Sequence, residues 1–81
     1  MTTVDLRALV LPPRMSAEVL KLLATIEAAE SILAVNMVAQ CAEGFVLGLE
    51  TAGVLHTDFT KGLCAGFATA TRLRREALRD A

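Results

Sequence analysis

Apolar residues recur at intervals of three and four along most of this chain, the spacing that places them on one face of an α-helix. From residue 17 to residue 52 there is no proline, and the first glycine is Gly44. Ser16 precedes this stretch as a candidate N-cap, and Gly53 follows it as a candidate left-handed residue at the helix end. The pattern therefore predicts one long helix over residues 17–52.

A second, shorter helix is predicted over residues 58–79. Thr57 is its candidate N-cap, and Asp58 suits the positive end of the helix dipole. Arginines are frequent in its last turns, where cations complement the negative end of the dipole. The two helices would then pack as an antiparallel hairpin around a short turn.

Residues 1–15 are predicted to form an N-terminal arm. Five aliphatic side chains make it apolar enough to dock on another surface, and Pro12 and Pro13 end whatever structure it adopts. Both a short helical turn and an extended segment fit its sequence. The predicted fold is therefore all-α, an arm followed by a long–short helical hairpin over residues 16–81.

Four of the five glycines lie around the turn in two matched pairs. Gly44 and Gly48 are four residues apart before it, and Gly62 and Gly66 are four apart after it. Counted outwards from the turn, Gly48 falls at the height of Gly62, and Gly44 at the height of Gly66. Small residues at this spacing let helix backbones approach closely. We predict that these glycines line the contact between the two helices; a glycine face between subunits, or chance, are the alternatives.

The apolar content exceeds what one small domain can bury. Hydrophobic residues make up 54% of the 81 positions. A chain of this size leaves about 40% of its unfolded surface exposed to solvent after folding, so part of this apolar surface stays accessible. On a projection of residues 17–52, several aliphatic side chains fall outside the main apolar face: Leu22, Ile32, Val35, Val46 and Leu47. We predict that they form a surface for a partner or for another subunit, and that the hairpins assemble into a homo-oligomeric bundle, a dimer or larger.

Two carboxylates interrupt the main apolar face of the predicted long helix. Glu27 and Glu30 project onto that face, as does Ser31. The sole histidine, His56, lies at the turn, so the pair cannot form a carboxylate–histidine metal site within one chain. We expect both glutamates to extend beyond the shorter helix and to meet solvent or arginines, with a functional groove as the alternative.

The residues needed for catalysis are scarce. One histidine beside a turn offers no nucleophile–base arrangement, and no phosphate-binding loop or metal-ligand spacing is present. Cys41 and Cys64 lack a CxxC spacing and are predicted to be unpaired, buried thiols. The sequence therefore predicts neither an enzyme nor a cofactor or metal site.

The location predicted from the sequence is the cytoplasm. The N-terminal residues lack the basic segment and the apolar run of a signal peptide. The longest stretch without a charge, residues 31–42, has 12 residues, which is too short to cross a bilayer.

The predicted function is binding rather than chemistry. The leading hypothesis is a non-enzymatic protein, of a bacterial or mobile-element accessory type, that masks, inhibits or scaffolds a larger protein. The alternative is a small dimeric regulator that binds nucleic acid through arginines near the C-terminus: Arg72, Arg74, Arg75 and Arg79. A net charge of −1 and acids among these arginines favour the first hypothesis, in which the arginines pair with acids of the neighbouring helix or subunit.

Overall fold

The computed structural model describes residues 11–81, and these fold into three α-helices without a strand. Helix α1 spans Pro13–Ala28, α2 spans Ile32–Ala52 and α3 spans Thr57–Asp80. The all-α prediction is confirmed for this part of the chain. Most of the predicted N-terminal arm, residues 1–10, lies outside the described residues.

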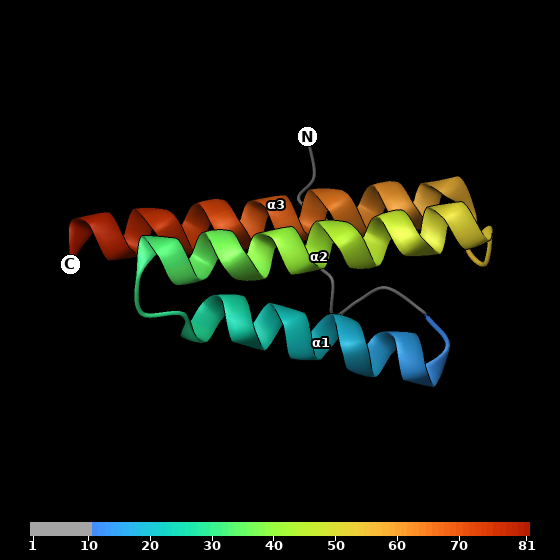
Figure 1. Ribbon diagram of the computed structural model, residues 1–81, viewed down its shortest axis with the longest axis horizontal. Coiled ribbons are helices and arrows are strands. Elements are labelled where there is room, and N and C mark those ends of the chain that lie inside the picture. The colour runs from blue at the N-terminus through green and yellow to red at the C-terminus, as the bar shows by residue number, and fades with distance from the viewer. Residues whose placement is uncertain (1–10) are drawn as a thin grey trace.

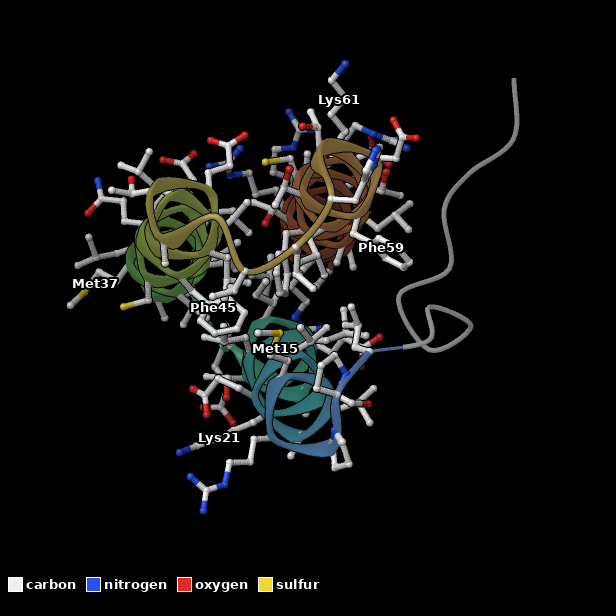
Figure 2. The ribbon with its side chains drawn as sticks, turned by 90° about the vertical axis from the view of Figure 1, so that its right-hand side faces the viewer. Met15, Lys21, Met37, Phe45, Phe59 and Lys61 are labelled. Carbon is white, nitrogen blue, oxygen red and sulfur yellow. The ribbon has the colours of Figure 1, made fainter. Side chains whose placement is uncertain are left out.

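The three helices lie side by side along the long axis of the molecule, each antiparallel to the one before it (Figure 1). Viewed along that axis, they occupy the corners of a triangle (Figure 2). Every pair of helices is in contact. Each helix therefore has two neighbours in the chain and one side that neither neighbour covers.

The predicted long helix over residues 17–52 is wrong, because the chain breaks helical geometry at residues 29–31. Ala29 takes an extended conformation with φ −61° and ψ 133°. Ser31 is also extended, with φ −144° and ψ 158°, and its Oγ accepts a hydrogen bond from the Ala34 N–H at 3.1 Å. Ser31 therefore acts as the N-cap of α2, a role that serine favours strongly.

Two arginines of α3 hold the chain on either side of this break. The Arg74 Nε donates to the Ala29 carbonyl at 2.8 Å, and so satisfies an acceptor that the end of α1 leaves without a helical partner. The Arg75 guanidinium donates to the Asn36 Oδ1 in the first turns of α2, with an Nε–Oδ1 distance of 2.9 Å. The carboxyl-terminal half of α3 thus fastens α1 and α2 at the point where they separate.

The other helix ends differ from the predictions in part. Helix α1 begins at Pro13, where a proline lacks only an N–H that the first turn does not use, so Ser16 lies inside the helix and is not its cap. The cap of α3 is His56, not Thr57, because the His56 Nδ1 accepts from the Asp58 N–H at 3.1 Å. Gly53 ends α2 in the left-handed conformation with φ 65°, as predicted.

The hydrophobic core lies on the axis of the bundle, and all three helices contribute to it. Its buried members are Val19, Leu23, Ile26, Ala42, Val46, Leu63 and Phe67. Leu11, just before α1, packs against this cluster. Val35 is also fully buried. Val35 and Val46 were predicted to face a partner; that prediction is wrong, because the break rotates α2 relative to a continuous helix.

We expect Arg74→Ala to lower the free energy of unfolding by about 2 kcal/mol, because it leaves the carbonyl of buried Ala29 without its charged donor. Arg72→Ala is the matched control: Arg72 pairs with Glu76 on its own helix, and exposed pairs of this kind contribute under about 0.5 kcal/mol. Urea denaturation followed by circular dichroism measures both. Equal losses in the two variants would show that the contact between Arg74 and Ala29 does not hold the break.

Candidate binding surfaces

The side of α2 that faces away from α1 and α3 is uncharged, exposed and apolar except for Gln40. Its three large side chains are solvent-accessible to a high degree, Leu33 at 70%, Met37 at 60% and Leu47 at 61%. Figure 2 shows Met37 pointing away from the other two helices, while Phe45 on the same helix points towards α1. We define the outer face of α2 as Leu33, Met37, Cys41, Gly44, Leu47 and Gly48, all of them exposed.

The glycine prediction is corrected for α2. Gly44 and Gly48 are exposed, and a Cβ atom at either position would have no neighbouring atom within 4 Å. These two glycines therefore do not line the contact between α2 and α3. On α3, Gly66 is buried and Gly62 is half-buried. The count from the turn thus fails for the first pair, and the glycines of α2 belong to the outer face.

A groove between α1 and α2 adjoins the outer face. Its volume is about 560 Å³. It is lined by Leu22, Thr25, Met37, Val38, Gln40 and Cys41. Leu22, one of the residues predicted to meet a partner, is half-buried at this groove. Met37 and Cys41 belong to both surfaces, so the exposed apolar region continues from α2 towards α1.

The sequence indicated this surface but did not locate it correctly. Of the residues predicted for it, Leu47 lies on the outer face and Ile32 is exposed beside it. Leu33 was missed, and Met37 was assigned to the core-facing side of a continuous helix. The polar run from Glu27 to Ser31 on that supposed apolar face was the available signal, because a Ser N-cap there restarts the helix with a new phase.

The two glutamates of that run have no common site. Glu27 and Glu30 are both exposed, the first on α1 and the second within the break. Glu27 lines a shallow groove between α1 and α3 with Leu73 and Arg74 among its other residues. The long helix on which they were expected to extend beyond the shorter one is broken at residues 29–31.

The predicted arginines of α3 separate into two groups. Arg74 is half-buried and turned to the Ala29 carbonyl. Arg72, Arg75 and Arg79 line an open pocket of about 370 Å³ beside Ile32 of α2. The carboxylate of Glu76 is paired with one of these arginines, its Oε1 lying 3.1 Å from the Arg72 Nη1. We call Arg72, Arg75 and Arg79 the arginine end of α3.

The opposite end of the same side carries negative charge. Glu43 and Glu50 are exposed on α2, and within residues 11–81 neither has an ion-pair partner. Glu43 lines a cavity of about 360 Å³ together with Cys64 of α3, and burial and then the charges of Glu50 and Glu43 raise the pKa of that thiol above its ordinary value. The side of the molecule where α2 meets α3 is therefore acidic near the turn and basic near the break.

The described residues offer little for chemistry. Within residues 11–81, no three histidine, cysteine, aspartate or glutamate side chains come together in a way that could hold a metal ion. Cys41 and Cys64 are free thiols and both are exposed, not buried as predicted. The raised pKa of Cys64 further disfavours its reactive thiolate form.

Helix α2 is long and apolar enough to cross a membrane. In the part of the chain that the structure describes, it is the one helix whose length and composition would allow this, and only 17% of its most apolar 18 residues are buried within the molecule. An exposed apolar helix of this kind needs a cover, which either protein or lipid could provide.

Comparison of this chain with models of protein families, with curated proteins and with solved structures found no match.

We expect Gly48→Ala to raise the free energy of unfolding by about 1 kcal/mol, because a Cβ atom there enters open space and alanine favours the helix. Gly53→Ala is the matched control at the end of the same helix. It should lower stability by about 1–2 kcal/mol, because φ 65° is unfavourable for a residue with a Cβ atom. Urea denaturation at low protein concentration measures both changes. A loss of stability for Gly48→Ala would restore the glycine to a tight contact within the chain.

Proposed function

We propose that this protein is a non-enzymatic binding protein of the cytoplasm that self-associates and regulates a larger protein by masking, inhibiting or scaffolding it. The single observation that carries the proposal is the outer face of α2, which is apolar, uncharged and exposed along the helix. A bacterial or mobile-element accessory protein is the kind of protein that we expect to act in this way.

The spacing of the outer face suits another helix as its cover. Leu33, Met37, Gln40, Gly44 and Leu47 follow one another at intervals of three or four residues, which keeps them on one line along α2 with Gln40 as its polar member. An amphipathic helix from a partner could lie along this line and bury its own apolar side, completing a bundle of four helices. The adjacent groove between α1 and α2 would receive larger side chains from such a helix.

Charge on α2 favours a protein cover over a bilayer. Glu43 lies near the middle of the helix and Glu50 in its last turn. Both are exposed, and neither is paired within residues 11–81. Placing an unpaired carboxylate at bilayer depth costs several kcal/mol, whereas at a protein interface it can remain on the wet rim or meet a basic residue.

The arginine end of α3 supports the alternative function, a small regulator that binds nucleic acid. Arg72, Arg75 and Arg79 share one open pocket, so three guanidinium groups could reach neighbouring phosphates. The ion pair of Arg72 with Glu76 and the absence of an aromatic residue in the last turns of α3 make this the second choice.

A DNA gel-shift titration at several salt concentrations tests the alternative. A salt-dependent shift that is lost in the Arg72→Ala, Arg75→Ala and Arg79→Ala triple variant, and kept in Lys61→Ala at the other end of α3, would favour nucleic acid. We expect no such shift.

Site-specific photo-cross-linking tests the leading proposal. A photoreactive phenylalanine analogue is placed at Met37 on the outer face and, as the matched control, at Leu73 of α3, an apolar residue that is 53% exposed. In cells that produce the protein, we expect one larger protein to be cross-linked from position 37 but not from position 73.

The captured protein is then purified and its affinity is measured by calorimetry. Met37→Glu should weaken binding at least tenfold, since it places a charge in an apolar contact, and Leu73→Glu should leave the affinity unchanged. Equal cross-linking from both positions, or equal affinity of both variants, would contradict the assignment of the outer face to a protein partner.

A further inference from the structure

We propose that, in the free protein, the outer face of α2 is covered by the same face of a second copy, with the two α2 helices antiparallel across a two-fold axis. The inference rests on the proposed function, because it concerns the surface assigned to the larger partner. It adds that a second copy of the chain covers this face before the larger partner binds, and it specifies the orientation of that copy and the charged contacts that fix it.

The distribution of charge along one flank of α2 carries the inference. Near the turn, that flank holds Glu50, and Glu43 lies on the same flank near the middle of the helix; neither is paired within residues 11–81. Near the break, it meets the arginine end of α3, whose Arg75 is placed there by its hydrogen bond to Asn36. Arg79 beside Ile32 has no carboxylate partner in the described part of the chain. One copy thus presents unpaired charges of both signs at opposite ends of the same flank.

A two-fold axis perpendicular to α2 brings these opposite charges together. Such an axis reverses the direction of the helix, and it leaves each flank next to the same flank of the other copy. The acidic end of one copy then lies against the arginine end of the other, and symmetry repeats the contact. Electrostatic complementarity of this kind fixes orientation and register at an interface.

A parallel arrangement lacks this match. A two-fold axis along α2 would place the flank with Glu43 and Glu50 beside the opposite flank of the second copy, where α2 meets α1. Glu50 and Arg79 would then lie at opposite ends of the interface and remain without a partner. The match of Glu50 with Arg79 therefore favours the antiparallel pair.

The shape of the outer face agrees with this packing. The middle of α2 lies near residue 42, so an antiparallel pair brings Met37 of one copy close to Leu47 of the other. Gly44, which has no atom near the position of a Cβ, allows the two backbones to approach closely at the centre. A second copy would cover the three large apolar side chains of the outer face without any change within the bundle.

The biological consequence is a protein that masks its own binding face. A larger partner that uses the outer face of α2 must displace the second copy, so self-association and partner binding compete. The concentration of the protein would then set how much of it is available to the partner.

Sedimentation equilibrium at tens of micromolar tests the occupant. We expect a dimer for the parent protein and for Leu73→Glu, and a monomer for Leu47→Glu. Leu47 is 61% exposed in the chain, so its substitution should leave the helical circular dichroism and the melting of the monomer intact. A monomeric parent, or a dimer that survives Leu47→Glu, would overturn the inference.

A charge exchange tests the orientation. Glu50→Arg and Arg79→Glu should each weaken the dimer about tenfold, since each affects two symmetric contacts, and the double variant should recover much of the parent affinity. Losses that add up in the double variant would overturn the pairing.

Cross-linking gives an independent measure of the same orientation. In a background in which Cys41 and Cys64 are replaced by alanine, one copy carries Met37→Cys and the other Leu47→Cys. Residues 37 and 47 are about 15 Å apart along a helix, so a short bismaleimide should join 37 to 47 in an antiparallel pair. Efficient 37-to-37 and 47-to-47 products would show a parallel pair and overturn the inference.

Flotation with phosphatidylcholine–phosphatidylglycerol vesicles separates lipid from protein as the cover. The parent should stay in solution as a dimer; flotation that is lost in Leu47→Glu would overturn the inference in favour of a membrane.

These results are independent of the photo-cross-linking test. If the parent is a monomer and a larger protein is cross-linked from position 37, the proposed function is supported and the dimer is contradicted. If the parent is a dimer and no larger protein is cross-linked, the dimer is supported and the proposed function is contradicted.

Discussion

The interruption between α1 and α2 is the constraint on which the rest of the structure depends. It is stabilised by Ser31, which caps α2, and by Arg74, which donates to the Ala29 carbonyl at the end of α1. Without the interruption, one continuous helix could cover only one side of α3. With it, the chain turns back, three helices enclose a core, and α2 starts with a phase that directs Val35 inwards and Leu33 outwards.

Local signals in the sequence predicted the elements whose causes are local. The turn at Gly53 and the start of α3 follow from one glycine and a short polar stretch, and both were placed within a residue or so of their positions. The break was missed because neither proline nor glycine marks it. Its stabilising contact with Arg74 joins residues 45 positions apart, and such a contact has no signature in a window of one helix.

The candidate surfaces depended on that missed break. An exposed apolar surface was predicted from composition, and α2 does expose one, but every assignment of a face beyond residue 31 used the phase of a continuous helix. Val35 and Val46 were therefore placed outside and Met37 inside, the reverse of the structure. The sequence showed that the arginines form a cluster, but not the role of each one. Whether an arginine contacts the chain at the break or faces solvent depends on how α3 packs over the break.

The outer face of α2 is exposed because a bundle of three helices leaves one side of each helix uncovered. The uncovered sides of α1 and α3 carry charged residues, among them Lys21 and Lys61, which point into solvent (Figure 2). Helix α2 differs, because its uncovered side has no charge between Leu33 and Gly48 while both of its glutamates lie on one flank. A helix with apolar residues on all sides requires a neighbour on each of them. Within residues 11–81, neither α1 nor α3 covers the outer face of α2, so the neighbour proposed for this face is one that the charged flank of α2 can orient.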